Sequence, residues 1–341
     1  MSNPLPKIIV TSVVRSSNQG ESHGGVYLID LETEYYEKVI DWNEAQIDWT
    51  GRGGDRGLRG IAIYDKNIFI AASDEIFVYD EKFELLKSIK NQYLKHCHEI
   101  CIKNRKLFLT ATGYDSILVY DLEIGAFEIG YTLRLKPKSK FQLILKKMLN
   151  KIIIGYKYLK CSTFDPNSNK GPYLADTCHI NNVFPTHDDL LISGTKLNRA
   201  LVLSNKKIKG HFNIPFGTHN VQLYQNDLIY NDTANDQVSY INLKSNTSNT
   251  FELSDIDEQN ITHNEISDDH ARIKFGRGLI KHEHCLISGS SPSRINVFDI
   301  KSGMLVKTVV LSNDVRNAIL GIEVIELKYI KNLWLERKRL S

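Results

Sequence analysis

The chain has 341 residues, of which 42% are hydrophobic and 24% charged, and its formal net charge is +3. This composition is typical of a globular protein with a large core and excludes a disordered or collagen-like chain. No segment approaches the length of a membrane-spanning helix, and the first residues lack a secretory leader pattern, so we expect a cytoplasmic protein. Five cysteines, an odd number without paired spacing, predict reduced thiols.

Units of four short runs rich in Ile, Val, Leu, Phe and Tyr recur along the chain, separated by turn residues such as KN, SDE and GYD. Five such units begin at Arg59, His98, His179, His219 and Arg277. Four strands in a period of roughly 40 residues are the signature of a β-propeller blade, which buries its faces only by stacking on its neighbours. We interpret the longer intervals 98–179 and 219–277 as insertions within the repeat.

The two ends of the chain predict how the ring closes. Residues 6–14, 24–32 and 34–42 match the second, third and fourth strands of the other units, and a first strand is missing there. Residues 318–326 (AILGIEVIE) match the first strand, as seen in LRGIAIYD. A C-terminal strand that completes the first blade removes the open sheet edges. We therefore predict an all-β, single-domain fold over 1–341, a six-bladed β-propeller of four-stranded blades.

Positive charge is concentrated around the insertion at 136–176, with nine basic and no acidic residues between Arg134 and Lys160. Apolar residues at helical spacing alternate there with lysines, which predicts a basic amphipathic helix followed by a loop between blades 3 and 4. Segment 139–160 has two interpretations: peripheral contact with an anionic membrane, or packing on the propeller or a second subunit with its lysines in water. We favour the second. The basic tail 327–341 repeats the pattern weakly.

One position recurs at the start of each first strand, the strand that lines the channel of a propeller. We call these residues the ring: Arg59, His98, His179, His219, Arg277 and Leu320. Three imidazoles from consecutive blades can hold one divalent transition metal, Zn, Fe or Mn, with an open position for substrate. The alternative is that each histidine satisfies backbone groups in a polar channel without a metal.

Arginines on both sides of the histidines predict an anionic substrate. Arg59 and Arg277 flank them in the ring, and the glycine-rich run 50–60 brings Arg56 to the same mouth. Guanidinium groups bind carboxylate, phosphate or sulfate through paired donors. The run lacks the strand-before, helix-after context of a phosphate-binding loop, so we interpret it as a loop.

Acid and base candidates lie close to the ring in sequence. Glu99, Asp176 and Tyr114 are the predicted catalytic residues, since a carboxylate there can orient an imidazole or move a proton. Loop capping or a salt bridge to an arginine is the alternative role. Further candidates at the same mouth are Asp55, Asp232, His23 and His270. Cys97 and Cys178 precede ring histidines, and strand alternation predicts that they pack between blades.

The strand pattern resembles the six-bladed gluconolactonase and strictosidine-synthase class over nearly the whole chain. That class holds calcium through Glu, Asn and Asp oxygens, whereas the equivalent positions here favour histidine. The histidine constellation is similar to that of metal-dependent propeller enzymes, including carotenoid-cleaving oxygenases and oligogalacturonate lyases. Endings such as VYDLEIG and VFDIKSG resemble WD-repeat blades, but the Gly-His and Trp-Asp marks are missing.

These observations predict a metal-dependent enzyme, a lyase, hydrolase or oxygenase, that acts on a small anionic substrate. The alternative from a different class is a non-catalytic propeller that binds a protein or glycan partner, because the fold alone does not decide function. Nucleic acid is excluded as a partner, since the strands lack an interleaved basic and aromatic pattern.

Overall fold

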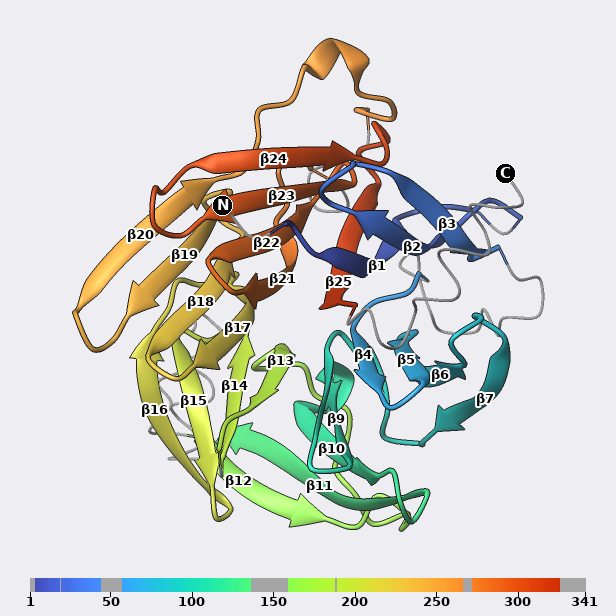
Figure 1. Cartoon of the computed structure of the whole chain (residues 1–341). Helices are drawn as coiled ribbons and strands as arrows, with labels where there is room; N and C mark the ends of the chain where they lie inside the picture. Colours follow the sequence, from blue (N-terminus) through green and yellow to red (C-terminus); the bar gives the residue numbers. More distant parts are fainter. Residues whose placement is uncertain are drawn as a thin grey trace.

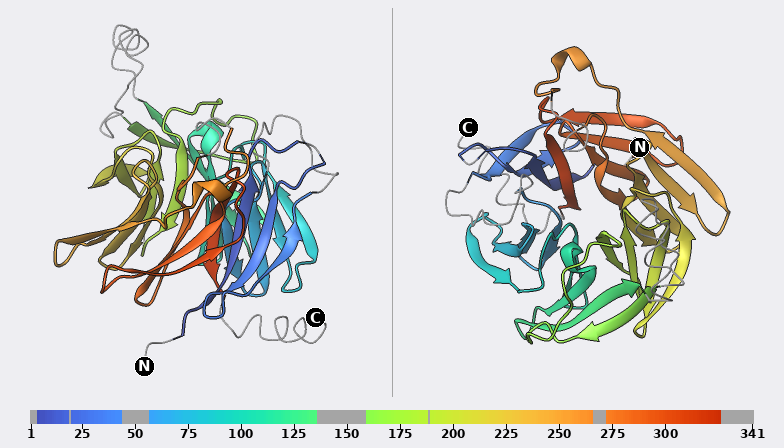
Figure 2. Two further views of the ribbon diagram at one scale, coloured as in Figure 1. Left: turned by 90° about the horizontal axis from the view of Figure 1, so that it is seen from above. Right: turned by 180° about the vertical axis from the view of Figure 1, so that it is seen from behind.

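The computed structural model describes residues 4–18, 20–43, 57–135, 159–187, 189–265 and 272–325. Six antiparallel sheets are arranged around a central axis as the blades of a propeller (Figure 1), and the view from above shows them stacked side by side (Figure 2). The predicted six-bladed β-propeller is therefore confirmed. In the described part of the chain, the helical elements are two short 3-10 turns, η1 (Thr112–Tyr114) and η3 (Glu258–Asn260).

Blades 1 and 2 each have four strands, which follow one another in space from the channel outward, whereas blade 3 has five. Blade 1 consists of β25 (Asn317–Val324), β1 (Lys7–Val14), β2 (Gly24–Asp30) and β3 (Tyr36–Asp41). Blade 2 consists of β4 (Ile61–Tyr64), β5 (Asn67–Ala71), β6 (Glu75–Tyr79) and β7 (Leu85–Lys90). Blade 3 consists of β8 (Ile100–Lys103), β9 (Lys106–Ala111), β10 (Ser116–Asp121), β11 (Ala126–Leu135) and β12 (Leu159–Phe164).

The remaining three blades have four strands each. Blade 4 consists of β13 (Ile180–Pro185), β14 (Leu190–Gly194), β15 (Arg199–Ser204) and β16 (Lys207–Asn213). Blade 5 consists of β17 (His219–Tyr224), β18 (Asp227–Asp232), β19 (Gln237–Asn242) and β20 (Thr247–Glu252). Blade 6 consists of β21 (Arg277–His282), β22 (Cys285–Ser290), β23 (Arg294–Asp299) and β24 (Leu305–Val310).

Burial follows the position of a strand within its blade. The second and third strands of blade 1, β1 and β2, are almost wholly buried, whereas outermost strands such as β7 and β20 are largely exposed. Large apolar clusters lie between every two neighbouring blades, from the pair of blades 1 and 2 around to the pair of blades 6 and 1. Because each blade buries both faces against its neighbours, the core is itself a ring.

The ring of blades is closed through blade 1. β25 pairs antiparallel with β1, in the register Ile8 to Val324 at one end and Val14 to Asn317 at the other. The first strands contact one another in an unbroken circle, β25, β4, β8, β13, β17, β21 and back to β25. The predicted completion of the first blade by a C-terminal strand is thus confirmed (Figure 1).

Blade 3 departs from the predicted four strands. Residues 159–164, predicted as part of a helix and loop, form a fifth strand that pairs with β11 from Gly130–Phe164 to Leu135–Leu159. Leu159 and Cys161 both pack into the apolar cluster between blades 3 and 4. Residues two apart point to the same face only in a strand, so this packing fits β12 and not a helix. The rest of the predicted helix, as far as residue 158, and the predicted tail 327–341 lie outside the described residues.

Candidate functional site

The ring residues stand where the first strands begin. Arg59 and His98 come two residues before β4 and β8, and His179 comes one residue before β13. His219 and Arg277 are the first residues of β17 and β21, while Leu320 lies within β25. Because the first strands form the wall of the channel, these side chains gather at one end of it, as the repeat alignment predicts.

Backbone irregularities at this level help to direct the side chains. The register shifts at the start of β13, β17 and β21, where blades 4, 5 and 6 meet the channel. A residue with positive φ lies within two of these shifts, Asn220 (52°) and Gly278 (69°), and His179 (51°) directly precedes the third. A bulge adds a residue and re-aims the neighbouring side chain, and bulges are enriched beside functional sites. Positive φ is uncommon for a residue with a side chain, so the backbone at His179 needs support from its surroundings.

His98 lies between the two ring arginines. Nη1 of Arg59 is 3.3 Å from Nε2 and 3.4 Å from Nδ1 of His98, and Nη1 of Arg277 is 3.4 Å from the same Nδ1. Burial, together with the positive charges of the two arginines, lowers the pKa of His98 well below its usual value. The imidazole is therefore neutral at pH 7, and the two guanidinium groups give this part of the ring a net positive charge.

His179 forms a hydrogen-bonded pair with Asp176 beside His98. Nδ1 of His179 lies 3.0 Å from both carboxylate oxygens of Asp176, and the His98 and His179 ring centroids are 5.3 Å apart. Lys196 holds Asp176 from the other side, with Nζ donating to its backbone oxygen at 2.7 Å and lying 3.4 Å from its carboxylate. Burial raises the pKa of Asp176, but the hydrogen bond from His179 and the charge of Lys196 outweigh it and lower the pKa overall.

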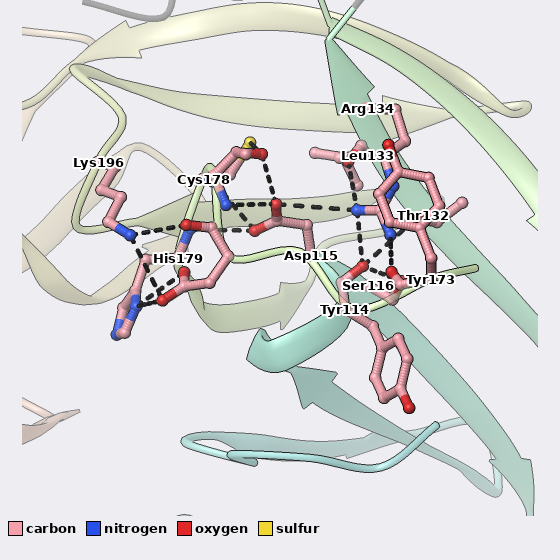
Figure 3. Close-up of polar contacts among 12 residues, drawn as sticks. Tyr114, Asp115, Ser116, Thr132, Leu133, Arg134, Tyr173, Cys178, His179 and Lys196 are labelled. Atoms are coloured by element: carbon pink, nitrogen blue, oxygen red, sulfur yellow. Dashed lines mark hydrogen bonds and ion pairs between the residues drawn. The ribbon is translucent and has the colours of Figure 1, made fainter. Parts of the chain in front are cut away.

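Asp115 supports the strained backbone that carries His179. Its carboxylate accepts hydrogen bonds from the backbone N–H groups of Thr177, Cys178 and His179 at 2.7, 3.0 and 3.1 Å, and from the Thr177 hydroxyl at 2.6 Å. Figure 3 shows Asp115 between the His179 and Tyr114 side chains. A carboxylate of blade 3 thereby fixes the entry into the first strand of blade 4.

His219 is 5% exposed, and its hydrogen bonds define its tautomer. The Thr233 hydroxyl donates to the Gly276 carbonyl at 2.8 Å, so at 3.0 Å it accepts a proton from Nδ1 of His219. Nε2 of His219 then carries a lone pair, and it has no hydrogen-bond partner among the described residues. Burial, with the charges of Arg277 and Arg15, lowers the pKa of His219 well below its usual value, so this imidazole is also neutral at pH 7.

Two of the three predicted metal ligands, His179 and His219, are oriented by oxygen atoms. Nδ1 of His179 and Nδ1 of His219 are engaged by oxygen atoms, which is how metal-bound histidines are usually oriented. In the described ranges, however, no group of three His, Cys, Asp or Glu side chains is arranged to hold a metal ion. The transition metal at His98, His179 and His219 stays a prediction.

The predicted catalytic residues are placed differently from one another. Asp176 contacts His179 directly, whereas the Tyr114 hydroxyl donates to the Gln92 carbonyl at 3.3 Å, and its phenol points away from His179 (Figure 3). Burial raises the pKa of Tyr114. The structure thus brings Asp176, and not the Tyr114 side chain, to the ring.

Glu99 lies inside the channel below His98. Its carboxylate accepts a hydrogen bond from Nδ2 of Asn220 at 2.6 Å, which joins blade 3 to blade 5. Burial and the negative charge of Glu323 raise the pKa of Glu99 to about 8. This carboxyl lines the space between the first strands and holds its proton at neutral pH.

The other sequence candidates lie either in the blades or outside the described residues. Cys97 and Cys178 are buried in the apolar clusters between blades, as predicted, and burial raises the pKa of each thiol to about 12. His23 is fully buried, with Nδ1 against the Ser17 hydroxyl. The candidates outside the described residues are Arg56, Asp55 and His270.

The alignment missed an aromatic and arginine group that completes the positive side of the site. The guanidinium carbons of Arg15 and Arg277 each lie 4.7 Å from the Phe275 ring centroid, and that of Arg272 lies 5.4 Å away. The Phe275 and His219 rings are 6.0 Å apart. The sequence feature that could have indicated this group is the clustering of basic residues around Phe275 just before β21. Arg15, which follows β1, had no comparable signal.

Comparison with known proteins supports the fold. No family model matches the sequence, and no curated protein does either. A protein of unknown function from Bacteroides caccae has a TM-score of 0.54 and 10% identity, covering 93% of this chain and 98% of its own. Apo AztD from Citrobacter koseri has a TM-score of 0.52 and 9% identity, with 94% and 98% covered.

A lyase is also among the similar structures. Virginiamycin B lyase from Staphylococcus aureus has a TM-score of 0.46 and 10% identity, covering 79% of this chain and 96% of its own. At these identities the similarity of the better-matching structures concerns the fold alone. No helix in the described ranges is long and apolar enough to cross a membrane.

Proposed function

We propose that the ring binds a small anionic substrate and that the pair of His179 and Asp176 transfers a proton on it, in a reaction of the lyase or hydrolase type. The observation that carries this proposal is the position of two guanidinium groups on one neutral imidazole. Arg59 and Arg277 both reach His98 within 3.4 Å. An anion with several oxygen atoms is the ligand that such convergent donors recognise.

Electrostatics at the mouth favours an anion over a cation. His98 and His219 are neutral at pH 7, because their pKa values are lowered. They therefore add no positive charge of their own, and each imidazole can accept a hydrogen bond. Arg277 and Arg15 stack on Phe275 beside His219, which keeps two guanidinium groups on the same side. In a partly buried site, these charges act through a lower effective dielectric than in water.

The second part of the proposal concerns proton transfer. Asp176 accepts the Nδ1 proton of His179, so Nε2 carries the lone pair that removes a proton from the bound substrate. The imidazolium that forms is stabilised by the Asp176 carboxylate, whose lowered pKa keeps it ionised. The proton then returns from Nε2 to the leaving group or to the product.

Binding of small anions tests the first part of the proposal. Calorimetric titration of the full chain with phosphate, sulfate and malonate should give saturable binding to the native protein. Arg277→Gln should weaken it at least tenfold, since one of the two guanidinium groups on His98 is lost. Arg105→Gln is the matched control, because Arg105 is an exposed arginine paired with Glu123. Equal affinity in the Arg277 variant would contradict the proposal.

Turnover of a panel of small carboxylate and phosphate esters and hydroxy acids tests the second part. For any substrate found, Asp176→Asn should lower kcat at least a hundredfold and change KM little, because the arginines stay in place. Anion binding without turnover of any panel member would favour the alternative of a non-catalytic binding propeller. Elemental analysis of the same preparations tests the predicted metal: one transition metal per chain, lost in His179→Ala, would confirm it.

A further inference from the structure

Directly below the ring, the channel contains a cavity of about 100 Å³ that the proposed function does not use. Its wall comes from the first strands a few residues after the ring positions, for example Glu99 after His98 and Glu323 after Leu320. A volume of this size accommodates a few non-hydrogen atoms. The cavity is therefore a second compartment that continues from the anion-binding mouth.

Two carboxyl groups and an amide oxygen of this cavity are acceptors, whereas the donors of Asn220, Gln222 and Tyr224 are used within the protein. Glu323 lines it, and the described residues provide no hydrogen-bond donor for its carboxyl group. Asn182 is 1% exposed and also lines it; its Nδ2 donates to the Val221 carbonyl at 2.7 Å, while its Oδ1 has no hydrogen-bond donor in the described ranges. Glu99 supplies a second carboxyl group, held by Asn220.

Glu323 is protonated in the empty channel at neutral pH. A ligand that supplies N–H groups and a positive charge would bind its carboxylate as the proton leaves to water, while the Asn182 and Glu99 oxygens accept further hydrogen bonds. The remaining wall is mostly apolar, with Ile61, Leu279 and Ile322 among its residues. Apolar walls suit the carbon atom of an organic amine better than the hydration shell of a metal ion. Separate acceptors around a small space match the N–H donors of an ammonium group.

We propose that the channel cavity binds a protonated amine between Glu323, Glu99 and Asn182. Combined with the proposed function, on which this step rests, the ring and the cavity select a zwitterionic ligand, with its acidic group on Arg59 and Arg277 and its amine in the channel. The same chemistry is also supplied by a free ammonium ion, and titration with both kinds of ligand separates these two sources.

The position of Glu99 links the two compartments. Glu99 is adjacent in sequence to His98, and the positive charge of Arg277 acts on its carboxyl group. A Cβ atom placed on Gly60, the neighbour of Arg59, would lie 2.9 Å from a Glu99 carboxyl oxygen. The cavity therefore begins at residues adjacent in sequence to ring residues. A short zwitterion can place its acidic group on the ring and its amine in the cavity.

The test uses the full chain and three kinds of titrant. Methylammonium and ammonium probe the cavity alone, acetate and phosphate probe the ring alone, and ω-amino acids from glycine to 5-aminovalerate probe both. Tetramethylammonium, which has no N–H group, and calcium are the comparison cations. The variants are Glu323→Gln, which preserves the shape of the side chain, and Glu84→Gln as a control at an exposed carboxylate.

We expect methylammonium to bind and tetramethylammonium not to bind, with at least a tenfold loss of affinity in Glu323→Gln and none in Glu84→Gln. An ω-amino acid that binds at least tenfold more tightly than methylammonium, and loses this gain in Arg277→Gln, identifies the amine of a larger ligand. Equal affinities of the ω-amino acids, methylammonium and ammonium identify free ammonium as the ligand. Failure of the anion arm alone would remove the proposed function and leave the amine site standing.

The amine site itself is overturned by any of three results. One is the absence of methylammonium binding in a native protein whose circular dichroism and Tm are unchanged. Another is calcium binding that is tighter than amine binding and is lost in Glu323→Gln, since the acceptors would then form a metal site. A Glu323→Gln protein that binds amines as well as the native protein would also refute the assignment.

Discussion

Replacing Glu323 by Gln should stabilise the protein, and the gain should grow with pH. Burial raises the pKa of Glu323 from 4.5 to about 8. Between these values the unfolded chain has lost the proton and the folded protein retains it. The native protein is therefore progressively destabilised as pH rises from 4.5 to 8, by about 1.4 kcal/mol per pH unit. Glutamine carries no charge and escapes this penalty.

The magnitude follows from the difference between the two pKa values. At pH 7 the accumulated penalty is about 3 kcal/mol, which corresponds to about 4 °C in Tm for a chain of this length. At pH 4.5 the two proteins should melt at nearly the same temperature. Because Glu323 also raises the pKa of Glu99, the difference in Tm reports the titration of these two neighbouring carboxyls together.

The assay is thermal unfolding followed by circular dichroism, in amine-free buffers from pH 4.5 to 8. Glu84→Gln, at an exposed carboxylate, provides a baseline that should be flat across this range. A constant offset between native protein and Glu323→Gln at all pH values would refute the reasoning, since it would show that Glu323 does not titrate differently in the folded state. A variant less stable than the native protein at pH 7 would refute it as well.

Two further substitutions test the support of the ring. Asp115→Ala removes the acceptor of three backbone N–H groups that precede β13. The free energy of unfolding, measured with urea, should fall by about 2 to 4 kcal/mol. An unchanged unfolding midpoint would show that Asp115 does not hold the backbone of His179. Gly60→Ala would place a Cβ atom 2.7 Å from the Ile100 nitrogen. The free energy of unfolding should fall by about 1 to 3 kcal/mol, and anion binding should weaken in the calorimetric titrations. Full stability would show that β4 and β8 can separate freely.

The sequence was sufficient to predict the architecture because each blade repeats the same local pattern. Strand runs, turn residues and the recurrent ring position all follow from short-range features, and the closing strand was found by matching residues 318–326 to the other first strands. β12 was missed because Leu159 and Cys161 follow an apolar series at helical spacing, which concealed their alternation. Pairing with β11 then decided the local structure.

The site was predictable in position and not in its contacts. Alignment placed His98, His179 and the two ring arginines at one level, but the distances between His98 and each arginine depend on bulges and side-chain directions. Glu99 and Glu323 are far apart in the sequence and become neighbours only because the ring closes. No periodic signal marks such a pair, so its shared cavity required the three-dimensional structure.

The pairing of β25 with β1 has a consequence for biosynthesis. β1 is synthesised about 300 residues before β25, its inner neighbour in the blade. Joining segments so distant along a flexible chain costs about 5 kcal/mol in entropy, and topologies dominated by such distant pairings fold slowly. Until β25 is made, β1 therefore presents an open edge, which makes this strand the natural target for a chaperone that binds nascent chains.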